Sequence, residues 1–338
     1  MHGEAGLRGV YTILPTPFDD AGALDEPSLR SLVDFVIERG VHGLTILGVL
    51  GEASKLSDAE RERVISITVD AVAGRTPVCV GTSQPGTDRC IALSRRAEAL
   101  GAASLMVAPP ALARPSEDAI RRHYGAVAQS VTLPIVVQDH PPSSGAFMTP
   151  AFLGGLAAEL PACRWLKLED EPTAPKISAV LRANPDVRVF GGLGGMFLLE
   201  ELGRGAVGTM TGFAFPEVLV AVHRRCASGD TDAAAEVFYR YLPLIRFENQ
   251  AAINLVLRKH VYWLRGAIAS PAARAPFSPI DETTKIELVD LIDRLGLDPS
   301  GREVPDDPWP ARGGRAAQDF PRSDCRADQP IQRSDTEP

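Results

Sequence analysis

Eight short apolar segments, separated by longer segments with helical periodicity, restrict the fold more than any other feature of this sequence. They are rich in Val, Ile and Leu and occupy residues 10–14, 43–47, 77–81, 103–108, 134–138, 164–168, 187–191 and 206–210. Most are continuously apolar, which is typical of parallel strands buried on both faces. Eight such strands, each followed by a helix, predict an α/β fold of the (β/α)₈ TIM-barrel type; a doubly wound open sheet is the alternative.

The segments between the strands carry both the periodicity and the boundary signals of amphipathic helices. In residues 26–40, apolar side chains recur at positions 29, 32, 33, 36 and 37, and Gly40 follows them as a stop signal. Residues 57–74 begin with Ser57 and Glu60, which have the spacing of a capping box. Strand and helix are therefore expected to alternate along most of the chain.

Three regions are expected along the chain. The barrel is predicted over residues 1–215, because the strand signals stop there. Residues 216–297 contain consecutive long helical patterns and are predicted to form a C-terminal helical segment. Residues 298–338 are rich in Pro, Gly, Arg and Asp and hold too few apolar side chains to bury a core, so a disordered tail is predicted.

Charge and cysteine content favour small-molecule chemistry. The formal net charge is −8 and the basic residues are scattered, which argues against a nucleic-acid or anionic-membrane partner. The five cysteines lie far apart without metal-ligand spacing, so we expect no disulfide framework, no metal and no cofactor. No signal peptide is apparent, and no apolar run reaches the roughly 18 residues of a membrane span. A cytoplasmic protein is predicted.

A lysine lies inside the apolar segment RWLKLED, residues 164–170. Trp165, Lys167 and Glu169 share one face of this predicted strand, and Lys167 lies at its C-terminal end, where barrels of this type carry their active sites. Burial would favour a neutral amine, which can form a Schiff base with a ketone. The alternative is a lysine that extends from the barrel rim into solvent.

Several motifs in order resemble the dihydrodipicolinate synthase and N-acetylneuraminate lyase family of Schiff-base aldolases. They are GVYTILPTPF near the N-terminus, VCVGTSQPGT, LPIVVQDHP, WLKLED and GAVGTMTGF, and the similarity covers roughly residues 7 to 297. The family's G-x-x-G-E loop, which follows the second strand, corresponds here to Gly48, Val49, Leu50, Gly51 and Glu52. The resemblance implies that Lys167 forms the Schiff base and that the protein is a homotetramer or a dimer.

The departures from the family pattern indicate a different substrate from that of the lysine-pathway synthase. Where the family carries a proton-relaying tyrosine in a Tyr-Asn-x-Pro motif, this chain has Gln138, Asp139, His140 and a proline. The synthase's carboxylate-binding arginine falls on Ser143. A Gln-Asp-x-Pro motif followed by Lys-x-Glu resembles instead the 2-keto-3-deoxy sugar acid dehydratases, such as the ketodeoxyarabonate enzyme.

The expected activity is that of a lyase acting on a 2-oxo acid, with dehydration of a 2-keto-3-deoxy sugar acid preferred. An aldolase that condenses or cleaves pyruvate and an aldehyde is one alternative, and a catalytically inactive binding scaffold is another. The sequence does not separate dehydration from cleavage, because both proceed from the same iminium on the lysine.

Each further site residue has an expected role and most have a structural alternative. Glu169, Asp139 and His140 are the candidate acids and bases, although they could equally pair with a rim cation, cap a turn and lie in a solvated loop, respectively. Gln138 is expected to orient substrate or water, since an amide does not titrate near neutrality. The loop of residues 48–52 would offer amides to the substrate carboxylate. Gly191 and Thr211 are expected to line the pocket.

Overall fold

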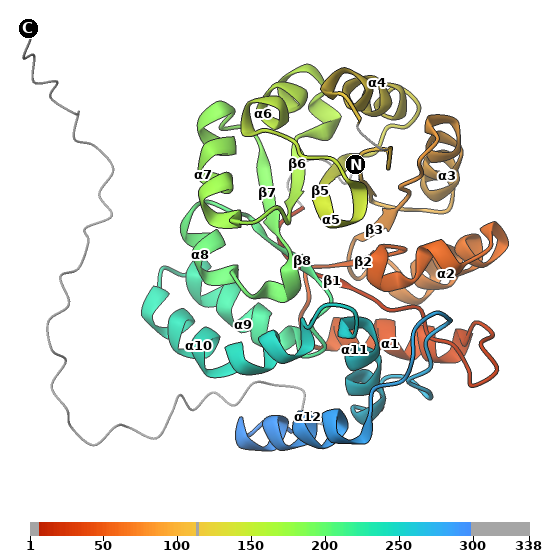
Figure 1. Ribbon diagram of the computed structural model, residues 1–338, viewed down its shortest axis with the longest axis vertical. Coiled ribbons are helices and arrows are strands. Elements are labelled where there is room, and N and C mark those ends of the chain that lie inside the picture. Colours follow the sequence, from red (N-terminus) through yellow and green to blue (C-terminus); the bar gives the residue numbers. More distant parts are fainter. Residues whose placement is uncertain (1–6, 113–114, 299–338) are drawn as a thin grey trace, which may run out of the picture. The chain divides into compact units, whose positions relative to one another are not determined.

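Eight parallel strands close into a barrel in the computed structural model, which describes residues 7–112 and 115–298. The chain divides into two units, Met1–Asp306 and Asp307–Pro338, and everything described here belongs to the first. Neighbouring strands pair in sequence order around the ring (Figure 1), which confirms the predicted (β/α)₈ fold. The strands are β1 (Gly9–Ile13), β2 (Gly43–Ile46), β3 (Val78–Gly81), β4 (Ser104–Val107), β5 (Ile135–Asp139), β6 (Trp165–Leu168), β7 (Arg188–Gly191) and β8 (Gly208–Thr211).

Helices follow each strand and surround the barrel (Figure 1). They are α1 (Glu26–Glu38), α2 (Asp58–Val72), α3 (Thr87–Ala99), α4 (Glu117–Ala128), α5 (Pro141–Ser144), α6 (Pro150–Glu159), α7 (Thr173–Ala183), α8 (Leu198–Gly203) and α9 (Pro216–Ala227). Short 3₁₀ turns are η1 (Val49–Gly51), η2 (Ala53–Lys55), η3 (Pro161–Cys163) and η4 (Leu193–Gly195). The expected capping box of α2 is present, with Ser57 and Glu60 each bonding the other's backbone.

Three further helices, α10 (Thr231–Glu248), α11 (Asn254–Leu264) and α12 (Glu282–Arg294), form the C-terminal segment. Helix α9 follows β8 and packs beside β1, so the strand-helix alternation runs beyond the expected boundary at residue 215. The strand pattern in the sequence ends with the last strand of the barrel, and the last barrel helix, α9, follows it. The predicted disordered tail lies outside the described residues, apart from its first residue.

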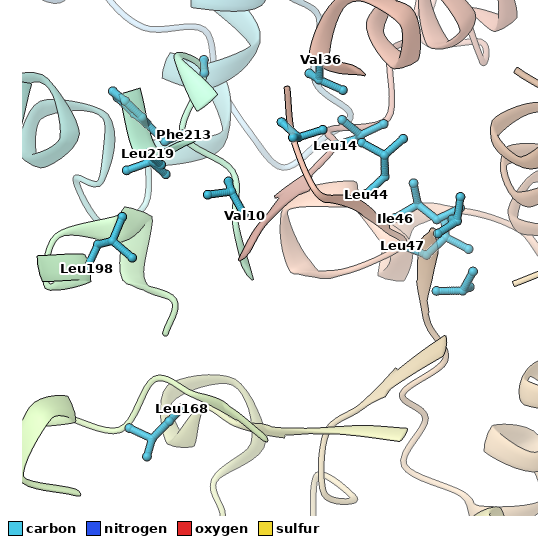
Figure 2. Close-up of a cluster of buried hydrophobic side chains, with 14 of the residues drawn as sticks. Val10, Leu14, Val36, Leu44, Ile46, Leu47, Leu168, Leu198, Phe213 and Leu219 are labelled. Carbon is cyan, nitrogen blue, oxygen red and sulfur yellow. The ribbon is translucent and has the colours of Figure 1, made fainter. Parts of the chain in front are cut away.

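Strand alternation separates two apolar groups. Tyr11, Cys79, Met106, Val136, Trp165, Phe190 and Met210 fill the interior of the barrel. The alternate strand residues pack outward against the helices, and Figure 2 shows part of this larger cluster, with Val10 and Leu44 from strands, Val36 from α1 and Leu198 from α8. Side chains thus point inward at every second strand position. None of the described helices has the length and apolar character to cross a membrane.

Candidate active site

Three polar side chains meet above the apolar interior at the C-terminal end of β5 and β6. Lys167 Nζ lies 2.9 Å from Glu169 Oε2, and Gln138 Nε2 donates a hydrogen bond of 2.9 Å to the same oxygen. The register of the two strands pairs Gln138 with Lys167, which brings both side chains inward at the same level. Lys167 and Gln138 are only 3% and 5% exposed.

The charges in this cluster compensate one another. Burial raises the pKa of Glu169, but the Lys167 charge, the His140 imidazole and the Gln138 hydrogen bond outweigh it, so the pKa lies below its ordinary value. Glu169 is therefore an ionised carboxylate at neutral pH. Because a buried lysine without a counter-charge would cost several kcal/mol, roughly 3 to 5, Glu169 is what allows Lys167 inside the strand.

A cavity of about 400 Å³ opens beside this cluster. It lies over the ends of β2, β3, β4 and β5 and includes Gln138 in its wall, together with Gly48, Val49, Met106, Ser143 and Ser144. This volume is in the range of small-molecule sites, and Gln138 connects the cavity to Lys167. The arrangement brings together an amine, a carboxylate and an amide where a small 2-oxo acid can enter.

The loop of residues 48–52 contributes to the cavity only at its beginning. Gly48 and Val49 line it, and Val49 is 65% exposed. The amides of Gly51 and Glu52 donate within the turn, to Gly48 O at 3.0 Å and Val49 O at 3.1 Å. Leu50 reaches across to Gly212, after β8. The expectation that the whole loop offers amides to an anion therefore does not hold for Gly51 and Glu52.

Glu52 does not line the cavity as expected, and its carboxylate instead holds parts of the chain together. Its carboxylate is buried, lies 2.6 Å from Lys259 Nζ of α11 and 2.8 Å from Lys55 Nζ, and accepts the Arg274 amide at 3.0 Å. Residues far apart in the sequence are thereby tied to the loop after β2. The glutamate of the G-x-x-G-E loop therefore anchors the C-terminal segment to the barrel.

Asp139, Gly191 and Thr211 face the helices and not the barrel interior, which differs from the expectation for all three. Asp139 Oδ2 lies 2.6 Å from Lys176 Nζ of α7, and burial raises its pKa to about 6 despite this partner. Thr211 follows the inward-pointing Met210 and pairs in register with Thr12 of β1. A Cβ on Gly191 would lie 1.7 Å from an oxygen of Glu201 in α8. Strand alternation is the reason, since each of the three follows an inward position.

His140 continues the inward series that Gln138 begins, two residues further along the chain. It is partly buried, and its Nδ1 lies 2.7 Å from Ser143 Oγ. Burial lowers the pKa of His140, the Glu169 charge opposes this effect and the Lys167 charge adds to it. The charges of both Lys167 and Glu169 therefore act on the pKa of the His140 ring.

Sequence reasoning missed Arg258 in α11, a residue distant along the chain. It is 2% exposed, its stem lies 3.5 Å from the Cβ position of Gly212, and the Glu169 charge acts on its pKa, which burial lowers. The C-terminal segment thus adds a cation to the edge of the site. No periodicity distinguishes it from the other basic residues of α11.

Comparison with known proteins matches residues 6–295 to the model of the dihydrodipicolinate synthetase family. The chain belongs to this family. Its members are Schiff-base lyases, both aldolases and dehydratases. The resemblance inferred from the G-x-x-G-E, Gln-Asp-x-Pro and Lys-x-Glu motifs is confirmed.

Two curated relatives carry different activities. L-2-keto-3-deoxyarabonate dehydratase of Azospirillum brasilense is 35% identical over 293 residues, which are 85% of this chain and 94% of that protein. 4-hydroxy-tetrahydrodipicolinate synthase of Methanopyrus kandleri is 33% identical over 300 residues, which are 87% of this chain and 98% of that protein. Both relatives support membership of the family, and their names give two different reactions, a dehydration and a synthase reaction.

Solved structures share the fold. Dihydrodipicolinate synthase of Rhodopseudomonas palustris is 36% identical with a TM-score of 0.81, covering 86% of this chain and 98% of that chain. A prophage protein of E. coli from the dihydrodipicolinic acid synthase family, in complex with pyruvate, is 29% identical with a TM-score of 0.82, covering 87% and 100%. The barrel described here is therefore the family's barrel.

Proposed function

We propose that this protein dehydrates a 2-keto-3-deoxy sugar acid through a Schiff base on Lys167. The observation that carries the proposal is the convergence of Lys167 and Gln138 on one oxygen of Glu169 beside the cavity. Glu169, whose carboxylate contacts Lys167, supplies a base. It replaces the family's tyrosine, whose position in this chain is occupied by Gln138. The relative from Azospirillum brasilense, named as a ketodeoxyarabonate dehydratase, supports the same reading.

The chemistry follows from the positions of these groups. Lys167 first passes a proton to Glu169 and attacks the C2 ketone of the 2-oxo acid as a neutral amine. The same proton then goes to the carbinolamine oxygen, which leaves as water, so that an iminium forms and Glu169 is again ionised. The iminium draws electrons from C3, so the C3 proton becomes acidic and Glu169 removes it. The resulting enamine expels the C4 hydroxyl, which takes a proton and leaves as water while the C3–C4 double bond forms. Hydrolysis of the iminium then releases the product and regenerates Lys167. Gln138 keeps the Glu169 carboxylate oriented by its hydrogen bond.

Aldol cleavage or condensation is the second candidate, and the synthase relatives favour it. It uses the same iminium, but the base takes the proton of the C4 hydroxyl and the C3–C4 bond breaks. A binding scaffold without activity is a weaker alternative, because it requires neither the amine nor the carboxylate in contact. A homotetramer or dimer and a cytoplasmic location stay predictions.

The test is a product assay on a panel of 2-keto-3-deoxy acids that differ in length and stereochemistry. We expect one acid to lose water faster than it releases pyruvate, and Lys167→Arg to abolish both products while keeping a positive charge beside Glu169. Pyruvate release without dehydration would favour the aldolase. Absence of both products from every acid would leave the binding scaffold.

A further inference from the structure

The short helix α5 joins a histidine and a serine at the edge of the cavity. His140 Nδ1 lies 2.7 Å from Ser143 Oγ, and the same hydroxyl reaches the carbonyl oxygen of His140 at 3.1 Å. The two residues are separated by two prolines, Pro141 and Pro142, which restrict the backbone of this turn. The imidazole and the hydroxyl are therefore held together by the local fold.

One member of this pair lines the cavity, and the other lies within reach of the charges of Lys167 and Glu169. Ser143 lines the cavity together with Gln138. The His140 ring is close enough to β6 for the charges of Glu169 and Lys167 to act on it. A ligand bound to Lys167 that extends into the cavity would therefore share that space with the Ser143 hydroxyl.

Dehydration requires an acid at the C4 oxygen, and the other groups at hand do not provide one. Glu169 carries the C3 proton at this stage, but its carboxyl is held against Lys167 and Gln138, and the Gln138 amide does not titrate. Of the described residues that line the cavity, Arg61 alone is ionisable, and its guanidinium donates to Ala53 O at 3.1 and 2.7 Å. Arginine does not release its proton. Ser143 is the lining hydroxyl that touches a titratable side chain.

We propose that Ser143 delivers a proton to the C4 oxygen of the bound 2-oxo acid, with His140 as the positioning residue that resupplies it. This inference rests on the proposed function. As the C4–O bond breaks, the departing oxygen takes the Ser143 hydroxyl proton and leaves as water, while Ser143 takes the Nδ1 proton of the neutral His140 ring and Nε2 of the ring takes a proton from solvent. Glu169 then releases the C3 proton to solvent, which replaces the proton taken by His140, so the protons balance over one turnover.

Ser143→Ala tests the proposal, with Ser228→Ala as the matched control. The exposed Ser228 hydroxyl, after α9, likewise donates to the carbonyl oxygen three residues earlier, Arg225 O at 2.9 Å, but Ser228 does not line the cavity. For each variant we would measure exchange of the pyruvate methyl protons in D₂O and dehydration of the acid that wild type dehydrates best. Exchange needs only the iminium and the Glu169 base.

We expect Ser143→Ala to slow dehydration about 100-fold, the lower range for loss of a general acid, while exchange stays within about threefold. Ser228→Ala should keep both rates, and Ser143→Thr should recover most of the dehydration. His140→Gln should also lower dehydration alone, and combining it with Ser143→Ala should add little, since the two act as one unit. Equal losses of exchange and dehydration would overturn the proposal.

A leaving group that needs no proton gives an independent check. With 4-chloro-2-oxobutanoate, chloride departs unprotonated, so Ser143→Ala should eliminate it within about threefold of the wild-type rate. A loss of chloride elimination as large as the loss of dehydration would contradict the relay. If wild type dehydrates no acid of the panel, the proposed function fails; if it dehydrates one and Ser143→Ala matches it, only the relay fails.

Discussion

Lys167 is placed inside a buried strand because Glu169, two residues later on the same strand face, supplies its counter-charge. The distance of 2.9 Å between Lys167 Nζ and Glu169 Oε2 makes this an ion pair within the barrel. A pair of this kind serves chemistry more than stability, since replacing it with apolar groups is often neutral. Glu169 is thus both the partner that holds the lysine and the proposed base.

Glu169→Gln should therefore lower both proton exchange of pyruvate and dehydration by about 100-fold or more, because the base is lost while the amide keeps the shape. Asp170→Asn is the control, since Asp170 follows in the chain and pairs with Lys176 outside the barrel. Steady-state rates of both variants would be compared. Equal rates for Glu169→Gln and wild type would remove Glu169 from the mechanism.

Buried Glu201 in α8 should make the stability of the protein depend on pH. Burial raises its pKa from 4.5 to about 7, opposed by the Thr173 hydroxyl and assisted by the Glu169 charge. Between these two values the folded state keeps a proton that the unfolded state loses, so wild-type stability falls as pH rises. The amide of Glu201→Gln does not titrate, so the unfolding free energy of this variant should not fall in the same way. Its advantage over wild type should grow from pH 4 to 8 and reach up to about 3 kcal/mol. Urea denaturation of both proteins at several pH values measures this difference. A difference in unfolding free energy that stays constant from pH 4 to 8 would contradict the prediction.

Individual site residues could be predicted from the sequence only in part. Lys167, Glu169 and Gln138 lie together as expected, because strand alternation and the family resemblance agreed on them. Asp139, Gly191 and Thr211 were chosen for lying at strand ends, and alternation turns each of them toward a helix. Ser143 was noted only for replacing an arginine, since its contact with His140 depends on how α5 turns.

Among the elements, the loop after β2 is fixed by the C-terminal segment. Glu52 is fully enclosed between Lys55 and Lys259, and Arg274 bonds its carboxylate through its amide. Burial lowers the pKa of Lys259 to about 8 although Glu52 opposes this. The loop of residues 48–52 and helix α11 therefore stabilise one another.

Glu52→Gln should cost about 3 to 5 kcal/mol of unfolding free energy, because it leaves the Lys259 charge buried and unpaired. Urea denaturation measures this. Glu26→Gln breaks an ion pair with Arg63 on the surface and should leave the midpoint unchanged. Equal midpoints for both variants would show that Glu52 does not anchor the segment.

All eight strands were predicted within two residues, because each is a distinct apolar run. Helix α9 was assigned to the C-terminal segment, since its pattern does not differ from those of α10 and α11. Helix α5 was not anticipated: four residues that include two prolines read as a turn.

Across the whole molecule, closure of the barrel depends on close backbone contact between β8 and β1. A Cβ at Gly208 would lie 1.9 Å from Gly9 O, whereas Gly155 in α6 has nothing within 4 Å of that position. Gly208→Ala should therefore prevent stable folding or lower the melting temperature strongly. Gly155→Ala should raise stability by up to about 1 kcal/mol through helix propensity. Similar melting temperatures would contradict this account of closure.

The overall architecture followed from periodicity alone, because alternating apolar runs and helices leave few arrangements of a parallel sheet. What the one-dimensional pattern could not supply was the contact between segments distant in the chain, such as Arg258 beside the barrel mouth. These contacts arise only when the C-terminal helices pack, and no local spacing encodes them.

The most direct test of the central claim is borohydride reduction in the presence of pyruvate, followed by intact mass and peptide mapping. A stable adduct on the peptide that carries Lys167, and none on the peptide of the neighbouring Lys176, is the predicted result. Lys167→Arg should give no adduct while retaining the folded barrel. Absence of an adduct from wild type, or an adduct that persists in Lys167→Arg, would contradict the assignment of Lys167 as the Schiff-base residue.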